Sequence, residues 1–248
     1  MIIFYAQASL LFLFQLIAHA SVIYFLFFSF SWLGLVQILI FYFLFTGIGS
    51  DAIYHRLLAH GSYKPSKWFY ILGNLFATLG GAGSGIAWAA NHRAHHRYVD
   101  TENDPHSPHH KSAWRIQFFS MFEPVNIRMV TRLLTDSVLI FFHKFYWPIH
   151  IIYFMGLYYF YKPGIVTMYL VPAAMNWSMS AFINIFCHKY GYRVCDTNDK
   201  STNNFLIGIL SFGEGWHNYH HAHPSDHRCG HGKYELDPVA KIIEWVRV

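Results

Sequence analysis

Long apolar runs alternate with polar, histidine-rich stretches along these 248 residues. The first 50 residues contain no Asp, Glu, Lys or Arg, and the first formal charge is Asp51. A helix that crosses a membrane needs about 20 apolar residues, so this run predicts two helices joined by a tight turn at residues 29–32. The run is far longer than the apolar part of a secretory signal. The pattern therefore predicts a transmembrane hairpin over about residues 3–52.

A second apolar region predicts another hairpin over about residues 138–187. Lys162, Pro163 and Gly164 mark its turn, and Lys144 in its first arm can extend its amine to the membrane surface. A third stretch, residues 68–90, is also long enough to span. If it spanned, it would place the histidines before it and after it on opposite sides of the bilayer. We therefore expect a buried or interfacial helix there, an expectation that depends on the metal hypothesis below.

Composition and charge agree with a membrane protein and orient it. Hydrophobic residues make up 54% of the chain and charged residues only 12%, about half the usual share in soluble domains. None of the 18 Lys and Arg residues precedes Arg56, and all but two lie in residues 56–132 and 189–247. The positive-inside rule places these regions in the cytoplasm. The net charge of +5 fits this orientation, and no basic stripe indicates nucleic-acid binding.

We therefore predict an all-α integral membrane fold in a single domain, residues 1–248. Four transmembrane helices in two hairpins would be capped by a cytosolic helical domain formed by residues 53–137 and 188–248. The three cysteines, Cys187, Cys195 and Cys229, lack C-x2-C spacing, so we expect neither a zinc ribbon nor a disulfide framework.

Nine histidines form four clusters whose spacing suits a pair of metal ions. They are His55 and His60, then His92, His95 and His96, then His188, and finally His217, His220 and His221. Each H-x2-H-H triplet lies on one helical face, and its adjacent histidines can bind different metals. On a straight α-helix His55 and His60 point about 140° apart, so one small ion would not bind both, whereas two neighbouring ions could. Asn184, one turn before His188, could hold a metal-bound water.

The remaining polar candidates are assigned supporting roles. His19, His143 and His150 are expected to pack or to lie at the interface. Loop or supporting positions are expected for His106, His109, His110, His223, His227 and His231. Carboxylates orient ligand imidazoles through hydrogen bonds, and the candidates are Asp51, Asp100, Glu102, Asp104 and Glu214. Glu214, three residues before His217, is the best placed of these.

The residues alone leave the metal and the chemistry open. Imidazole nitrogens suit iron, zinc, copper or nickel, and structural zinc needs only four ligands. Two metals beside an apolar bundle indicate oxygen chemistry on an apolar substrate. A metal carrier or channel would instead have ligands along a path across the bilayer, and a membrane zinc hydrolase would need about three protein ligands.

Four segments carry a resemblance to a known family. They read HRLLAH, WAANHRAHHRYVDTENDPH, NIFCHKYGYR and GEGWHNYHHAHP. In order and separation they resemble the membrane fatty-acyl desaturases of the stearoyl-CoA (delta-9) desaturase type. The resemblance implies a di-iron centre held by the nine histidines, with Asn184 acting through water. It implies O2-dependent desaturation of a fatty-acyl chain, with a cis double bond often at the ninth carbon.

The same resemblance implies partners and alternatives. The fatty-acyl substrate would be linked to CoA, a carrier protein or a lipid, and a separate ferredoxin- or cytochrome b5-like donor would supply electrons. Two iron ions are the expected cofactor, with zinc as a possible substitute in recombinant protein. Hydroxylation, or oxidative decarboxylation to a terminal alkene, would use the same platform.

The resemblance also gives expectations for the substrate path. We expect tunnel walls from the last spanning helix and from one face of the second helix, namely Ile40, Leu44, Gly47 and Ile48. Aromatic candidates near the metals are Trp88, Trp177 and Trp216. Two departures from the family are visible: Asp51 replaces a small or hydroxyl residue, and residues 107–120 follow a different pattern. A phosphate-bearing carrier could contact Lys111, Arg115, Arg128 and Arg132.

Overall fold

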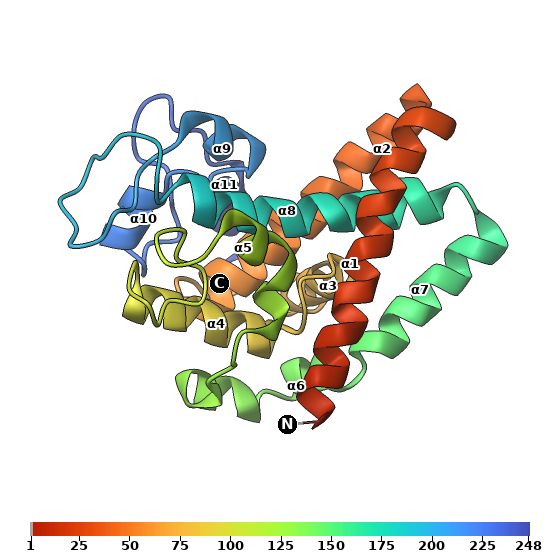
Figure 1. Cartoon of the computed structure of the whole chain (residues 1–248), viewed down its shortest axis with the longest axis horizontal. Helices are drawn as coiled ribbons and strands as arrows, with labels where there is room; N and C mark the ends of the chain where they lie inside the picture. Colours follow the sequence, from red (N-terminus) through yellow and green to blue (C-terminus); the bar gives the residue numbers. More distant parts are fainter. Residues whose placement is uncertain (1) are drawn as a thin grey trace.

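The computed structural model describes residues 2–248, with side chains from Gln7 onward, and its regular elements are helices joined by loops (Figure 1). In the described residues the only β pairing consists of three isolated bridges. The first half contains α1 (Ile2–Phe28), α2 (Trp32–Phe43), η1 (Leu44–Ala59), α3 (Lys67–Leu79), α4 (Gly85–Tyr98), α5 (Ala113–Phe119), η2 (Ser120–Phe122) and η3 (Ile127–Thr135). The second half contains α6 (Ser137–Lys144), α7 (Tyr146–Phe160), η4 (Ile165–Leu170), α8 (Val171–Phe186), α9 (Phe205–Leu210), α10 (His217–Ala222) and α11 (Pro238–Val246).

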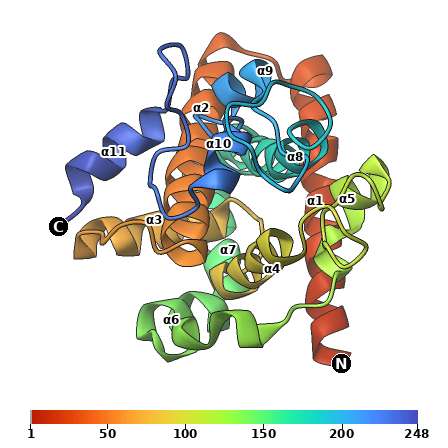
Figure 2. The same ribbon diagram turned by 90° about the vertical axis from the view of Figure 1, so that its left-hand side faces the viewer.

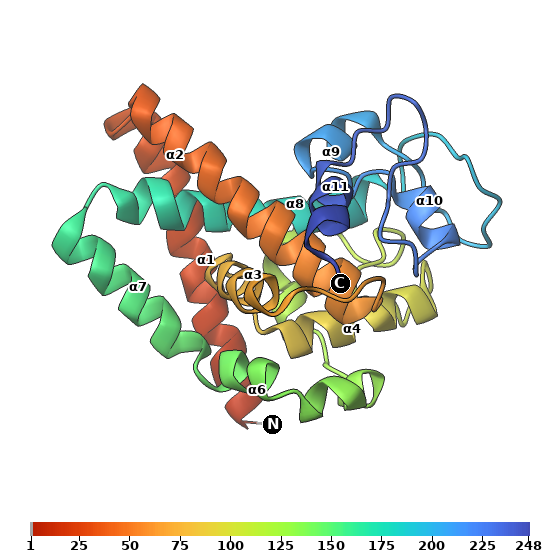
Figure 3. The same ribbon diagram turned by 180° about the vertical axis from the view of Figure 1, so that it is seen from behind.

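Two helices near the N-terminus are long and apolar enough to cross a membrane. They cover Gln7–Phe28 and Trp32–Ala59, with mean hydropathies of 2.1 and 1.9, and they form the expected hairpin (Figures 1 and 3). Ser31 ends the turn because its hydroxyl accepts a hydrogen bond from Gly34 N at 3.0 Å, which caps α2. Bulky side chains at the turn, such as Phe28 and Trp32, are each 76% exposed, which suits contact with lipid.

The second apolar region is less regular than the sequence predicts. Its first arm is not one straight helix, because α6 and α7 meet at an angle of 64°. Pro148, in the first turn of α7, lacks a backbone N–H and is favoured where a helix starts again. The pair is long and apolar enough to cross a membrane only as one bent span, so the described residues contain two or at most three candidate spans. The return arm consists of η4 and α8 (Figure 3).

The ambiguous stretch of residues 68–90 is two helices, not the single helix expected. Gly81 and Gly83 separate α3 from α4 with φ angles of +71° and +84°, a backbone conformation that only glycine adopts easily. Neither helix is among the candidate spans. The outer face of α3 carries exposed Trp68, Ile71 and Leu72, so this amphipathic helix agrees with the expected interfacial position.

The π-helix η1 is the element against which the rest of the site packs. Almost all of its side chains are buried, and it lies against α3 with very close backbone contact. A Cβ on Gly49 would lie 2.6 Å from the backbone of Ala77. Ser50 donates to Asn176 Oδ1 at 2.9 Å, and Asn176 donates to Gly80 O at 2.9 Å. These two bonds tie η1 to α8 and to the α3–α4 turn.

Candidate metal centre

The four histidine clusters, which lie on or beside η1, α4, α8 and α10, converge into one site. Figure 2 shows α4, α8 and α10 together on the face turned toward the viewer. The nine side chains form two groups, in each of which the ligand nitrogens all lie within 4.8 Å of one another. The five-histidine group contains His55, His60, His92, His96 and His220. The four-histidine group contains His95, His188, His217 and His221. Adjacent histidines in each triplet therefore belong to different groups, because neighbours on a helix point about 100° apart.

His55 and His60 lie in the same group, contrary to the geometry of a straight α-helix. The reason is local: the chain from Leu44 to Ala59 is a π-helix, in which hydrogen bonds join residues five apart. His60 N donates to His55 O at 3.2 Å. Residues five apart are therefore stacked one turn above the other, and both rings reach the same point.

The ring nitrogens face one another at distances that suit a shared cation. His60 and His92 are 2.9 Å apart between Nε2 atoms, and His220 Nε2 is 3.1 Å from both His55 Nε2 and His96 Nε2. In the other group His217 and His221 approach to 3.0 Å. Nitrogens about 2.1 Å from one ion and at right angles lie about 3.0 Å apart. The residues present therefore fit metal ions at both positions.

The tautomers of the histidine rings also indicate that metal ions fit between them. Where a carboxylate accepts the Nδ1 proton, Nε2 must carry a lone pair. The Nε2 atoms of His95 and His188 are buried, and neither has a hydrogen-bond partner. A buried acceptor without a partner is costly, and a cation between these rings removes that cost.

Burial lowers the pKa of seven of these imidazoles and so favours their neutral form. Desolvation, and then the charge of His55, lowers the pKa of His60 to about 2. Desolvation followed by neighbouring histidines also holds the pKa values of five others well below the usual range, namely His92, His96, His217, His220 and His221. Neutral imidazole is the form that binds metal, so the cluster is ready to bind cations near neutral pH.

Four carboxylates touch the outer nitrogens of the histidines. The contacts to Nδ1 are Glu214 on His55 at 2.5 Å, Asp104 on His95 at 3.0 Å, Asp100 on His188 at 3.1 Å and Asp199 on His221 at 2.8 Å. Such contacts fix the tautomer and the orientation of a ligand ring. Burial alone would raise the pKa of Asp104, but the hydrogen bond from His95 lowers it to about 2.

Sequence reasoning named three of these four carboxylates. Asp199 was missed because it lies in a polar loop whose path the local sequence does not predict. Glu102 is exposed and touches no ligand histidine in the described chain. Asp51 is buried, and no ion pair joins it to a ligand histidine in the described chain.

A buried arginine organises the region behind the five-histidine group. Arg56 is only 1% exposed; its Nε donates to Glu214 at 2.9 Å, and its Nη1 donates to Asp237 at 2.9 Å. It also donates to His227 O at 2.7 Å. One residue of η1 thus holds both Glu214 and the segment that leads to α11.

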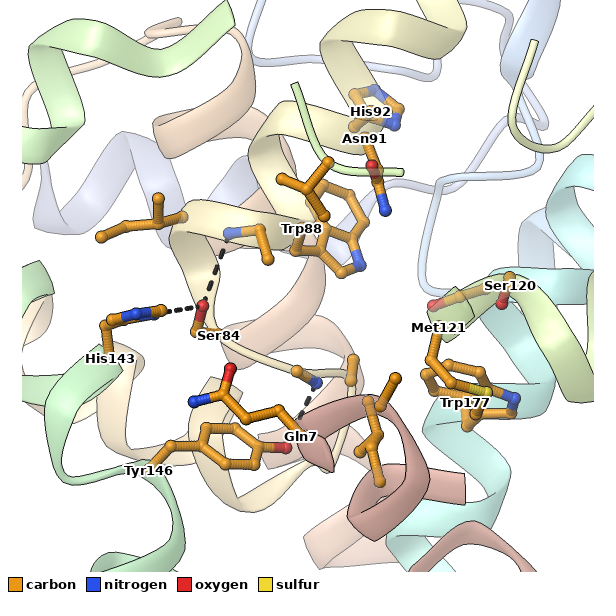
Figure 4. Close-up of a pocket in the computed structure, with 18 of the residues that line it drawn as sticks. Gln7, Ser84, Trp88, Asn91, His92, Ser120, Met121, His143, Tyr146 and Trp177 are labelled. Carbon is orange, nitrogen blue, oxygen red and sulfur yellow. Dashed lines mark hydrogen bonds between the residues drawn. The ribbon is translucent and has the colours of Figure 1, made fainter. Parts of the chain in front are cut away.

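An apolar cavity of about 410 Å³ reaches the metal centre, within the usual range of about 300–1,000 Å³ for small-molecule sites. Figure 4 shows Trp88 and His92 at one end, Trp177 and Met121 along one wall, and Tyr146 at the other end. α1, α4, α5, α7 and α8 all contribute residues to it. An elongated apolar ligand in this cavity would lie against His92 and Asn184.

The cavity corrects part of the expected substrate path. α8 lines it as predicted, but the second helix does not: Ile40, Leu44, Gly47 and Ile48 are all absent from its walls. α1 lines the cavity in place of the second helix, because α1 crosses α8 on the side of the cavity and α2 lies on the opposite side of α8. Trp88 and Trp177 do line it, whereas Trp216 is fully buried and its ring packs against Gly208.

Two of the four cations considered for phosphate are already paired. Lys111 and Arg115 both contact Glu123, at 3.1 Å each.

Asn184 lines the cavity, and its amide nitrogen donates to Ser180 O at 2.8 Å. No other histidine in the described part of the chain joins either group. His109, for example, contacts His188 O at 2.9 Å.

Comparison with known proteins agrees with this geometry. The fatty acid desaturase family model matches residues 30–245, so the chain belongs to the fatty acid desaturase family and is a fatty-acyl desaturase enzyme. It is 34% identical to delta-9 acyl-lipid desaturase 2 of Arabidopsis thaliana, over 89% of this chain and 74% of that relative. It is 32% identical to sn-1 stearoyl-lipid 9-desaturase of Anabaena variabilis, over 89% and 83%. An acyl-CoA 5-desaturase of Anemone leveillei is 33% identical, over 88% and 71%.

Proposed function

We propose that this desaturase introduces a cis double bond, at the ninth carbon, with a di-iron centre held by the nine histidines. Asn184 would hold a water on the metal in the four-histidine group. The observation that carries the proposal is the convergence of nine imidazoles, in groups of five and four, at the end of an apolar cavity. The names of the two relatives that act at position nine support the position of the double bond.

The overall reaction balances with one oxygen molecule. Two hydrogens leave adjacent carbons of the acyl chain, two electrons and two protons arrive from outside, and O2 becomes two waters. When bound, iron would allow O2 to oxidise an unactivated C–H bond of the acyl chain. Electrons would come from a separate ferredoxin- or cytochrome b5-like donor.

The protein's own residues supply position and environment. The cavity holds the acyl chain so that two adjacent methylenes lie beside His92 and Asn184. Its apolar walls, among them Trp88, Trp177 and Ala181, exclude water from the reacting carbons. The four carboxylates hold the ligand rings so that Nε2 faces the metal. Binding and orientation are thus separated from the redox chemistry.

We further propose a multi-pass arrangement with the metal centre on the cytoplasmic side. The four spans would be α1, α2 with the part of η1 up to about residue 52, the bent pair α6–α7, and η4 with α8. Residues 53–137, apart from interfacial α3, and residues 188–248 would form the cytosolic cap. The distribution of Lys and Arg supports this orientation.

Expression in a desaturase-deficient host tests the proposal. Fatty acids are profiled by gas chromatography and mass spectrometry, and the double bond is located. A new cis-9 monoenoic acid is expected, and it should vanish in a His220→Ala variant. A hydroxy acid or a terminal alkene would transfer the assignment to a sister reaction. Absence of any modified chain, with iron bound and a donor supplied, would overturn the proposal.

A further inference from the structure

Carboxylates that touch the ligand histidines are divided unequally between the two groups. Three of the four rings in the four-histidine group contact one. The pairs are His95 with Asp104, His188 with Asp100, and His221 with Asp199. All three contacts are 3.1 Å or shorter and all three histidine side chains are at most 1% exposed.

Only one carboxylate, Glu214, contacts a ring of the five-histidine group in the described chain, and the buried cation beside it, Arg56, is shared with Asp237. Glu214 contacts His55, while its other oxygen accepts a hydrogen bond from buried Arg56 at 2.9 Å. In the described chain no other histidine of this group forms an ion pair with a carboxylate. Direct contacts between carboxylates and ligand rings are therefore concentrated at the four-histidine group, three against one.

The cations near the four-histidine group do not cancel this difference. Lys111 Nζ reaches the Asp104 carbonyl oxygen at 2.9 Å, but Lys111 is itself paired with Glu123 at 3.1 Å. Lys200 contributes only its backbone N–H, which donates to Asp100 Oδ2 at 2.7 Å. Its exposed side chain makes no ion pair with the carboxylates of this group.

One loop supplies much of this arrangement. We call residues 193–203 the strap. Within it Asp199 contacts His221, and the next residue, Lys200, bonds Asp100 through its backbone. Arg193 braces the strap by donating to Asp199 O at 2.7 Å and to Thr197 O at 2.8 Å. Two consecutive residues thus reach two of the three carboxylate–histidine pairs.

From this asymmetry we propose that the two metal positions are electronically distinct, and that Asp100, Asp104 and Asp199 make the metal of the four-histidine group the more electron-rich and more firmly bound. The inference rests on the proposed di-iron function. Negative charge passed through a ligand imidazole raises its basicity, strengthens the metal–nitrogen bond and favours the higher oxidation state. The three aspartates are positioning residues, since they act through the histidines.

The test uses full-length protein in detergent, loaded with two equivalents of 57Fe(II). Ferricyanide then removes one electron per protein, and Mössbauer spectra report which iron becomes ferric. A chelator titration measures how firmly each iron is held. Asp199→Asn and Asp100→Asn remove charge at the four-histidine group, and Glu214→Gln removes it at the other. Asp196→Asn is the matched control, because Asp196 lies on the same strap, is exposed and touches no ligand.

Wild-type protein should give one localised ferric iron and release its two irons in separate steps. Asp199→Asn and Asp100→Asn should weaken the firmly held iron by about 10- to 100-fold and make it harder to oxidise. Glu214→Gln should affect the other iron, and Asp196→Asn neither. Equal oxidation of both irons in wild type, or effects of Asp199→Asn no larger than those of Asp196→Asn, would overturn the inference. Binding of fewer than two irons by wild type would instead contradict the di-iron function.

Discussion

Replacing Arg56 by Met should cost more stability than almost any other single change. Arg56 is 1% exposed and lies 2.9 Å from both Glu214 and Asp237. At an effective dielectric of 20, each such pair carries about 6 kcal/mol of Coulomb attraction before desolvation is counted. Arg56→Met would leave two buried carboxylates without their cation, and breaking a buried pair in this way costs about 3–5 kcal/mol.

Thermal unfolding in detergent, followed by tryptophan fluorescence, measures this loss. A cost of 3–5 kcal/mol corresponds to a fall in Tm on the order of 10 °C for a chain of this size. Arg228→Met is the control, because Arg228 pairs with Asp226 at the surface at 2.8 Å and should cost less than about 1 kcal/mol.

A compensated variant separates charge from packing. Adding Glu214→Gln and Asp237→Asn to Arg56→Met removes the unpaired charges, and Asn can still accept the cap hydrogen bond from Ala240 N. Part of the lost stability should return. The reasoning fails if Arg56→Met costs under about 1 kcal/mol, or if the triple variant is no more stable than the single one.

Three further predictions follow from the site and its packing. His220→Ala should abolish turnover and release iron, whereas His223→Ala, at an exposed position outside both groups, should retain both; product and iron assays decide. Ala181→Phe should fill the cavity that Ala181 lines and stop turnover of long acyl chains without loss of iron. Gly49→Ala would bring a Cβ within 2.6 Å of the α3 backbone and should cost about 3 kcal/mol, while Gly156→Ala, with open space around it, should be nearly neutral in the same unfolding assay.

The pH dependence of the metal-free protein provides a separate test. The folded-state pKa values of His60, His92 and His220 lie below the unfolded value, so the unfolded chain binds more protons as the pH falls through about 6.5. Stability should therefore be fully present above pH 6.5 and fall as the pH decreases, by about 1.4 kcal/mol per such histidine between pH 7.5 and 5.5. Unfolding midpoints at the two pH values measure the fall, and equal midpoints would contradict it.

The linear sequence was sufficient for the class of the protein and for naming the nine histidines that the structure brings together. A run of 50 residues without charge can only be accommodated in lipid or in a deep core, and nine histidines in repeated spacings have no simple packing role. The local sequence also indicated the first hairpin turn at residues 29–32, where Ser31 caps the start of α2. These features depend on neighbours within a few residues, which is the range that sequence reasoning covers.

Tertiary structure decided what depends on distant segments. His55 and His60 share one group because the chain from Leu44 to Ala59 is a π-helix, which no local signal predicts. This π-helix packs closely against α3. α1, not α2, lines the cavity because of how the helices cross. Asp199 reaches His221 across 22 residues only because the strap folds back. Side-chain type and spacing are local properties, whereas these contacts are set by the packing of segments far apart in the chain.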